Sequence, residues 1–318
     1  MRPENLLILG GTGFVGRSLC EKLVQRAQGG GRLVVPSRFA AHDQHIRMLP
    51  TVEVTQADVH DGATLAALVA GRDAVVNLVA ILHGSEADFE RVHVELPKRL
   101  ARACAAAGVR RIVHVSALGA AADAPSMYQR SKARGETALQ ASGLDVTLLR
   151  PSTLFGEHDR FMNLFARLQA WLPVMPLASA GAQFQPVWVE DVAGAIVRCL
   201  DDHSTIGQTI ECTGPQVLTL RELVQRAGRW SGHRRPVIAL PATLARLQAR
   251  LMEWLPGTPL LSRDNLESMQ RPNVASGVLP GLERLGIVPT PIEVVMAPVL
   301  GRRSPEARLD RWRAAGRH

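Results

Sequence analysis

The chain has 318 residues and a net charge of +8, with 46% hydrophobic and 21% charged residues, an ordinary globular composition. The longest apolar runs, AVVNLVAIL and IEVVMAPVL, fall well short of the ~18 residues of a membrane-spanning helix. A strand expected from residue 5 onward leaves no room for a signal peptide. The sequence therefore predicts neither a membrane-spanning nor a secreted protein. We expect a cytoplasmic protein, with a peripheral position on the inner face of a membrane as the alternative.

Half of the excess positive charge lies in the last eighteen residues, which hold six arginines against Glu306 and Asp310. This basic tail, 301–318, can contact anionic lipid or nucleic acid, or it is a solvated, frayed terminus. No basic stretch elsewhere is interleaved with aromatic residues, so we expect no nucleic-acid partner.

Neither the cysteines nor the histidines show the spacing of a metal site. The four cysteines, Cys20, Cys104, Cys199 and Cys212, lie far apart along the chain. This pattern favours buried thiols in a reducing compartment. The histidines His83, His93, His158 and His203 are scattered as well. We therefore expect no metal.

Short apolar runs alternate with helical patterns over the first two thirds of the chain. Strands are expected at 5–10, 31–37, 52–58, 73–80, 111–117 and 145–151, and helices at 15–27, 61–71 and 126–142, with a further long helix ending near Gly108. Asp61 or Thr64 is the expected cap of the helix at 61–71. Near-continuous apolar strands between helices indicate a parallel sheet covered on both faces. The predicted fold class is α/β, a Rossmann-type doubly wound parallel sheet with a smaller C-terminal lobe.

The pattern changes after Pro151. Six of the thirteen aromatic residues, Phe155, Phe161, Phe165, Trp171, Phe184 and Trp188, fall between 155 and 188, where they line an apolar cleft or form a local core. Helices are then expected at 189–200, 219–232 and 242–255, and a strand at 235–241. The predicted domains are a dinucleotide-binding domain at 1–155, to which 186–212 returns, a smaller substrate or partner lobe at 156–185 and 213–300, and the basic tail at 301–318.

A glycine motif follows the first predicted strand and leads directly into a helix. Gly10, Gly13 and Gly16 form G-x-x-G-x-x-G. In such a loop, glycines permit a tight turn, close approach of the backbone to a pyrophosphate, and close packing of helix on strand. The helix N-terminus offers free N–H groups to the phosphates. We therefore expect a dinucleotide here, with Thr12, Phe14 and Val15 also at the cofactor.

The ends of the following strands predict the rest of the cofactor site. The second strand ends in Ser37 and Arg38 rather than in an acidic residue. An arginine at this point suits the 2′-phosphate of NADP(H), which we therefore favour over NAD(H). The residues expected at the adenine and at the middle of the cofactor are Asp58, Val59, Leu78, Val79 and Ala80.

Tyr128 and Lys132 are four residues apart, which places them on one face of the helix expected at 126–142. Together with the glycine motif and the segments VVNLVA, VSALGA, LLRPSTLFG and PVWVEDVAGA, this pair resembles the extended and atypical short-chain dehydrogenases/reductases, the epimerase/dehydratase-like group, over residues 5 to 215. Within that group the sequence is similar to the branch that holds the accessory subunit of mitochondrial complex I with this fold and its bacterial relatives. SMYQRSKARGE, LRPSTLFGEHDRFMN and LLSRDNLESMQRPNV carry this closer likeness.

The resemblance implies roles for individual residues. Tyr128 would be the general acid/base, and Lys132 would hold the nicotinamide ribose and lower the pKa of the tyrosine. Pro151 and Ser152 would lie near the nicotinamide. The family normally places a Ser or Thr hydroxyl just after the fifth strand, where this chain has Ala117 and Leu118.

Two serines could replace the missing hydroxyl, Ser116 and Ser126, and Ser116 is also a candidate for contact with the cofactor. Loss of one such donor costs on the order of 10²–10³ in rate. Two functions follow. One is an accessory or assembly-type role linked to respiratory complex I or quinone metabolism, with a mainly structural cofactor. The alternative is an active NADP-dependent reductase or epimerase.

A helix over 242–256 presents Leu244, Leu247, Leu251 and Trp254 on one face. The helix either packs on its own lobe or, together with the basic tail, docks onto a protein complex or a membrane surface.

Overall fold

The computed structural model describes residues 3–39, 44–254 and 261–302. These form two compact units. The first consists of the described residues within Met1–Pro151, Val189–Cys212 and Ala275–Val288, and the second of those within Ser152–Trp188, Thr213–Val274 and Pro289–His318. Most of the predicted basic tail, from 303 on, and the last residues of the helix predicted at 242–256 lie outside the described residues.

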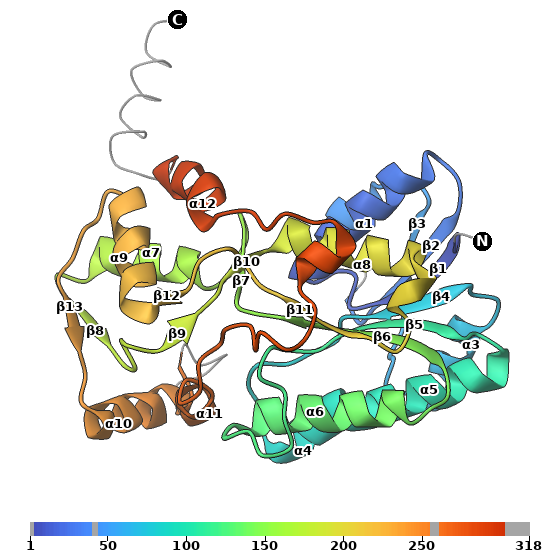
Figure 1. The fold of residues 1–318 in the computed structure, drawn as a ribbon, viewed down its shortest axis with the longest axis horizontal. Helices are drawn as coiled ribbons and strands as arrows, with labels where there is room; N and C mark the ends of the chain where they lie inside the picture. The colour runs from blue at the N-terminus through green and yellow to red at the C-terminus, as the bar shows by residue number, and fades with distance from the viewer. Residues whose placement is uncertain (1–2, 40–43, 255–260, 303–318) are drawn as a thin grey trace, which may run out of the picture. The chain divides into compact units, whose positions relative to one another are not determined.

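The first unit is built on one parallel sheet of seven strands in the order β11-β6-β5-β4-β1-β2-β3 (Figure 1). The strands are β1 (Asn5–Leu9), β2 (Arg32–Ser37), β3 (Val52–Gln56), β4 (Ala74–Asn77), β5 (Arg111–Val115), β6 (Asp145–Pro151) and β11 (Thr209–Cys212). The direction of strand addition reverses between β1 and β4, which creates the switch point where open α/β sheets bind their ligands. The predicted doubly wound parallel sheet is confirmed, with β11 as an additional strand.

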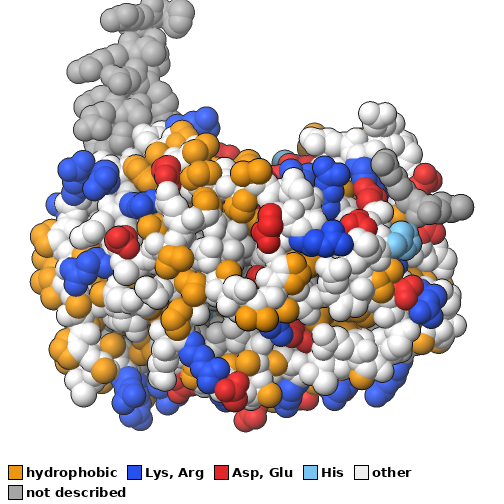
Figure 2. Space-filling model, viewed as in Figure 1, with side chains coloured by type: hydrophobic (Ala, Val, Ile, Leu, Met, Phe, Trp, Pro, Cys, Tyr) orange, Lys and Arg blue, Asp and Glu red, His pale blue; other side chains and the backbone are white. Residues whose placement is uncertain are grey.

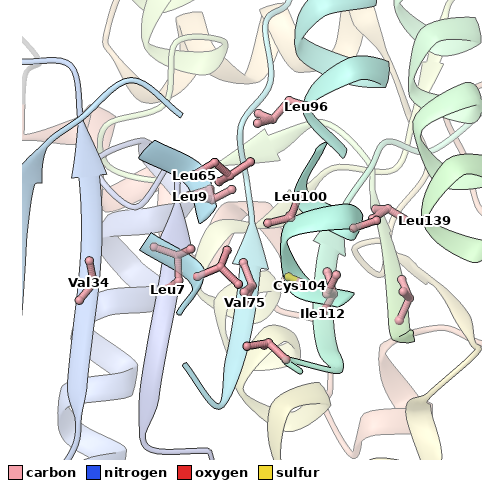
Figure 3. Packing of buried hydrophobic residues seen from close by; sticks show 14 of the residues in the cluster. Leu7, Leu9, Val34, Leu65, Val75, Leu96, Leu100, Cys104, Ile112 and Leu139 are labelled. Carbon is pink, nitrogen blue, oxygen red and sulfur yellow. The ribbon is translucent and has the colours of Figure 1, made fainter. Parts of the chain in front are cut away.

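Helices cover both faces of this sheet. One face carries α1 (Phe14–Ala27) and α8 (Val189–Asp201), and the other carries α3 (Gly62–Val69), α5 (Leu96–Ala107) and α6 (Met127–Gln140) (Figure 1). Figure 3 shows the apolar side chains of the second layer, where Leu7, Val75 and Ile112 of the strands meet Leu100 of α5. The central strands, such as β4 and β5, are mostly apolar because both of their faces are buried.

The segment between β4 and α5 was not predicted in detail. It consists of α4 (Glu86–Phe89) and a π-helix, η2 (Glu90–Glu95), which run directly into α5. Ser85 and Asp88 form a capping box at the start of α4. Gly108, in a left-handed conformation with φ 71°, ends α5 where the sequence predicted it.

One part of the predicted smaller lobe belongs to the first unit instead. Residues 275–288 bind along β11: the Ser276 N–H donates to the Glu211 carboxylate at 2.7 Å, and the Glu211 N–H donates to the Pro280 carbonyl at 2.9 Å. This segment therefore covers part of the outer edge of β11, and the lobe predicted at 213–300 is interrupted there. The remaining short helices are α2 (Gln44–Arg47), η3 (His203–Thr205) and η4 (Leu282–Leu285).

The second unit combines helices with three pairs of short strands. The helices are α7 (Met162–Trp171), α9 (Leu220–Trp230), α10 (Ala242–Glu253), α11 (Arg263–Ser268) and α12 (Ile292–Gly301). The strand pairs are β7 (Leu154–Phe155) with β10 (Val187–Trp188), β8 (Met175–Leu177) with β13 (Val237–Ala239), and β9 (Gln183–Phe184) with β12 (Leu218–Thr219). Within the described ranges, every helix is too short or too polar to cross a bilayer.

The aromatic cluster between 155 and 188 mainly forms the core of the second unit. Phe155 and Phe184 are buried in this core, and Phe161, Phe165 and Trp188 pack against it. Trp171 is the exception, because its side chain is 88% exposed. The local-core interpretation therefore holds for five of the six residues.

Candidate functional site

The glycine loop lies at the switch point of the sheet. It follows β1, and Gly10 has φ 79°, which L side chains rarely adopt. The Gly13 N–H donates to the Gly10 carbonyl at 3.0 Å and closes the turn. Gly13 is also the N-cap residue of α1 and has no side chain to bind the first N–H groups of that helix. These groups are available to a phosphate.

The loop has no room for side chains at its glycines. A Cβ on Gly16 would lie 2.4 Å from the backbone of Gly11, and a Cβ on Gly10 would lie 3.1 Å from the backbone of Leu78 and Val79. The loops after β1 and β4 therefore approach each other as closely as backbones allow. We call this closely packed glycine loop, together with the free N–H groups at the start of α1, the glycine cradle; its arrangement fits the pyrophosphate of a dinucleotide. Thr12, Phe14 and Val15 are half-buried around it, whereas Ala80 is exposed.

The ends of β2 and β3 offer groups for the adenosine part. Arg38 is exposed, and its guanidinium lies 5.9 Å from the centre of the Phe39 ring. The Ser37 hydroxyl accepts from the Phe39 N–H at 3.3 Å. Asp58 is exposed and accepts from the His60 N–H at 2.9 Å, while Val59 packs against the core. The described residues just after β2, through Phe39, carry no carboxylate.

Tyr128 and Lys132 lie one turn apart on α6, whose N-cap is Ser126. The Ser126 hydroxyl accepts from the Gln129 N–H at 3.1 Å and donates to the Gln129 side-chain oxygen at 2.9 Å. Lys132 is 1% exposed, and its Nζ donates to the Val115 carbonyl at 2.9 Å. Lys132 therefore ties α6, which also carries Tyr128, to the carboxyl end of β5, beside the switch point.

Burial controls the protonation of both residues. It lowers the pKa of Lys132 to about 8, against the opposing effect of the nearby Glu136 carboxylate. It raises the pKa of Tyr128 to about 12. The resemblance implied a lowered tyrosine pKa, and the structure gives the opposite direction because burial disfavours the charged phenolate.

The hydroxyl that the family places after β5 is missing in the structure as well. Ala117 and Leu118 occupy this position, 8% and 2% exposed. The hydroxyl of Ser126 is used for capping. Ser116 is buried, and its hydroxyl has no hydrogen-bond partner within the described part of the chain. The Ser126 hydroxyl is therefore occupied within α6, whereas the Ser116 hydroxyl is free to bind a ligand.

Two further predicted residues fall at the end of β6. Pro151 is the last residue of the strand, and its carbonyl accepts from the Leu118 N–H at 2.9 Å, next to the missing hydroxyl. Ser152 is the first residue of the second unit, and its hydroxyl donates to the Asn273 side-chain oxygen.

Three polar side chains near Lys132 were not assigned to the site from the sequence. His114 of β5 pairs its Nδ1 with the Asn77 amide nitrogen at 3.1 Å, and the Asn77 oxygen accepts from the Val79 N–H at 3.2 Å. His93 of η2 pairs with Ser131 of α6 at 2.8 Å. Asn77 and His114 are polar residues in otherwise apolar strands, and this polarity could have identified them as site residues from the sequence. No such sequence signal identifies His93, because its position in the site depends on the π-helix.

The described residues hold no group of three His, Cys, Asp or Glu side chains that could bind a metal ion. The four cysteines are buried and free. Burial raises the pKa of the Cys20, Cys104 and Cys199 thiols to about 12, so these thiols stay protonated.

Comparison with known proteins agrees with this geometry. Residues 6–212 match the model of the NAD dependent epimerase/dehydratase family. The chain is 33% identical over 312 residues to mouse NADH dehydrogenase [ubiquinone] 1 alpha subcomplex subunit 9, mitochondrial, covering 96% of this chain and 81% of that protein. It is 25% identical over 277 residues to the NAD(P)H azoreductase of Xenophilus azovorans, covering 86% and 90%.

A solved structure with a similar fold is that of a double mutant of the dTDP-glucose 4,6-dehydratase DesIV from Streptomyces venezuelae with NAD bound. It has a TM-score of 0.65 and 23% sequence identity, and the match covers 83% of this chain and 95% of that one. The glycine cradle at the switch point, the Tyr128/Lys132 pair and the matched family model together give the assignment. The chain belongs to the NAD dependent epimerase/dehydratase family, whose cofactor is a nicotinamide dinucleotide.

Proposed function

We propose that this protein is an NADP(H)-binding accessory or assembly protein, linked to respiratory complex I or to quinone metabolism, in which the dinucleotide is mainly structural. The observation that carries the proposal is an intact cradle combined with an incomplete catalytic set. The glycine loop and the Tyr128/Lys132 pair are kept, whereas buried Ala117 and Leu118 stand where the family has its hydroxyl. The relative named as a subunit of mitochondrial NADH dehydrogenase supports the same role.

The chain's own residues would hold the dinucleotide in a defined order. The uncapped N-terminus of α1 would bind the pyrophosphate, Arg38 the 2′-phosphate, and Lys132 the nicotinamide ribose. A bound nicotinamide supplies hydride chemistry. With a pKa near 12, Tyr128 keeps its proton at neutral pH, so it can donate a hydrogen bond but does not act as a base.

An active NADP-dependent reductase or epimerase is the second candidate, and two observations favour it. Lys132 and Tyr128 are held together at the end of β5, and a relative is named an NAD(P)H azoreductase. In that case Tyr128 would act as the proton donor beside Lys132, without the second hydroxyl.

Comparison of the wild type with Tyr128→Phe separates the two candidates. We expect purified protein to retain NADPH that is not oxidised by quinones, azo dyes or carbonyl compounds, and the variant to change only cofactor retention. The measurement is NADPH absorbance and fluorescence over a single turnover. Hydride transfer that falls by about 10² or more in Tyr128→Phe would contradict the accessory role and establish the enzyme.

The cofactor preference depends on Arg38. We expect NADP⁺ to raise the melting temperature more than NAD⁺, and Arg38→Gln to weaken NADP⁺ binding about 10- to 100-fold, the value of a charge-assisted hydrogen bond. NAD⁺ affinity should stay nearly constant. Arg32→Gln is the matched control, because Arg32 lies at the opposite end of the same strand and is also exposed. Equal stabilisation of the wild type by both dinucleotides would refute the role of Arg38.

An accessory role also needs a docking surface, and we propose the outer face of α10. Leu244, Leu247, Leu251 and Trp254 are 51%, 53%, 54% and 76% exposed, whereas the buried face of the helix consists of Ala245 and Ala249. The Arg250 guanidinium lies 6.0 Å from the centre of the Trp254 ring. Figure 2 shows apolar and cationic side chains next to each other in this region.

The charge of the second unit indicates the kind of partner. Its described residues include twelve arginines against seven Asp and Glu. Arg246, Arg250 and Arg263 line a surface groove between α10 and α11. Leucine, tryptophan and arginine side chains of this kind suit an apolar protein surface with an acidic rim. We therefore propose that a protein partner covers α10, in a cytoplasmic protein held peripherally at the membrane through that partner.

Exchange of Leu247 and Leu251 for serine should abolish docking and leave the fold intact, because both side chains are already exposed. The wild type is expected to co-sediment with NADH:quinone oxidoreductase activity in detergent extracts of its own cells, and the double variant to stay at the top of the gradient. Val217→Ser, at 51% exposure in the same unit, is the control. Loss of binding to anionic vesicles instead would identify a membrane surface as the partner.

A further inference from the structure

His93 is a buried side chain that connects the loop after β4 to Tyr128. It lies in the π-helix η2 and is 2% exposed. Its Nε2 is 3.1 Å from the Ile81 N–H nitrogen, and its Nδ1 is 2.8 Å from the Ser131 hydroxyl oxygen. The Ser131 hydroxyl in turn donates to the Tyr128 carbonyl at 2.8 Å.

These contacts define the direction of every hydrogen bond. A backbone N–H can only donate, so the His93 Nε2 accepts from Ile81 and the proton of the ring is on Nδ1. The Nδ1–H group then donates to the Ser131 hydroxyl oxygen, and the Ser131 O–H donates to the Tyr128 carbonyl. This chain of hydrogen bonds, from the Ile81 N–H through His93 and Ser131 to the Tyr128 carbonyl, requires a neutral imidazole. Burial and the nearby Lys132 cation lower the pKa of His93 to about 3, which keeps the ring neutral.

His93 also contacts the aromatic ring of Tyr128. The two ring centres are 5.4 Å apart at 80°, and Phe89 completes the group at 5.6 Å from His93 and 6.3 Å from Tyr128. Edge-to-face packing of this kind restricts a phenol ring. One side chain therefore holds both the backbone and the ring of Tyr128.

The other end of this chain of hydrogen bonds, at the Ile81 N–H, lies in the loop after β4. Ile81 directly follows Leu78, Val79 and Ala80, and the backbone of Leu78 and Val79 closes the glycine cradle. A dinucleotide that presses on this loop would move the Ile81 N–H, and this movement would pass through His93 to Ser131 and Tyr128. Packed cores transmit such small displacements because closely packed side chains leave little free volume between them.

We propose that His93 is a positioning residue for Tyr128, which couples the dinucleotide-binding loop after β4 to the orientation of the phenol. The inference rests on the proposed function in one respect, that a dinucleotide lies against this loop. It goes further in assigning a role to His93 and Ser131, whether or not the protein turns over a substrate.

Tyr128 is the only tyrosine among the 318 residues, which allows a clean test. Biosynthetic 3-fluorotyrosine gives a single ¹⁹F resonance from Tyr128. The probe ligand is 2′-phospho-ADP-ribose, which lacks the nicotinamide ring and so cannot contact the phenol through it. In the wild-type background we expect this ligand to shift the resonance, and in His93→Phe and Ser131→Ala we expect the shift to fall about twofold or more.

Ser142→Ala is the matched control. Ser142 also donates to the carbonyl three residues earlier, Leu139, at the end of the same helix, but does not contact His93. Ser131→Ala keeps the imidazole in place, so the test stands even where His93→Phe does not fold. A full ligand-induced shift in Ser131→Ala overturns the coupling. Failure of the wild type to bind the ligand, measured by calorimetry, instead overturns the proposed dinucleotide site and the inference with it.

Discussion

Replacement of Gly135 by alanine is expected to destabilise the first unit by about 3 kcal/mol, at the upper end of the cost of overpacking a core. Gly135 lies on α6, where this helix crosses η2. A Cβ there would be 2.0 Å from the His93 carbonyl oxygen and 3.5 Å from the Pro97 side chain. The first contact is with backbone and cannot be relieved by a rotamer change, so α6 and η2 must separate.

The same separation should reach the candidate site. Ser131 and Tyr128 lie one and two turns before Gly135 on α6, and both depend on contact with His93. We therefore expect Gly135→Ala to weaken dinucleotide binding as well. Urea denaturation with an unchanged m-value gives the loss of stability, and calorimetry gives the affinity.

Gly194→Ala is the control for the intrinsic effect of alanine. Gly194 is also a helical glycine, on α8, but its added Cβ would meet only the Ile287 side chain at 3.7 Å, an ordinary contact. In that setting alanine is expected to stabilise by about 0.5–1 kcal/mol through helix propensity. If both variants prove equally stable, α6 and η2 do not approach each other as closely as the structure shows.

The framework of the first unit could be predicted because its signals are local. The apolar strands, the glycine loop entering a helix and the Asp61 cap, which accepts from the Thr64 N–H at 2.8 Å, each depend on a few neighbouring residues. The π-helix could not be predicted, because six residues of altered hydrogen bonding leave the apolar periodicity nearly unchanged. The close contact between His93 of the π-helix and Gly135 of α6 could therefore not be predicted from the sequence.

The helix α10 shows a second limit of periodicity. The spacing of Leu244, Leu247 and Leu251 indicates one apolar face, and such a face usually points to a core. In the structure the small residues Ala245 and Ala249 are buried and the leucines are exposed. A hydrophobic pattern identifies an amphipathic helix, but which face is buried depends on its neighbours in the tertiary fold.

Replacement of Glu136 by glutamine is expected to cost about 1.5–3 kcal/mol, the usual value of hydrogen bonds to charged groups, because the Glu136 carboxylate is buried while 22% of the Arg150 side chain stays exposed. Glu136 is 3% exposed and pairs in a bidentate manner with Arg150 of β6, with Arg150 Nε 2.9 Å from Oε1. The neutral amide would remove the anion that Arg150 binds directly, with Glu211 remaining as a carboxylate that acts on it through space, and Lys132, one turn earlier on α6, would lose the carboxylate that raises its pKa.

Asp145→Asn provides the control. Asp145, at the start of β6, also forms a two-contact pair with an arginine, Arg110, at 2.9 and 3.2 Å. That pair is on the surface, with 61% of the Arg110 side chain exposed, so its loss should cost at most about 1 kcal/mol. A loss of similar size in both variants would contradict the burial of Glu136.

The same substitution should change the pH dependence of cofactor binding. Lysine is cationic below its pKa, and burial lowers that value for Lys132 to about 8 while Glu136 opposes the shift. Removal of Glu136 therefore lowers the pKa of Lys132 further, and Lys132 loses its proton at a lower pH.

Because the cation attracts the ribose hydroxyls and phosphates, wild-type affinity for NADP⁺ should fall as the pH rises through about 8. In Glu136→Gln this fall should begin at a lower pH than in the wild type, as calorimetry between pH 6 and 9 can show. A midpoint that does not move would mean that Glu136 acts on the fold through Arg150 alone, and that the charge of Lys132 does not depend on it.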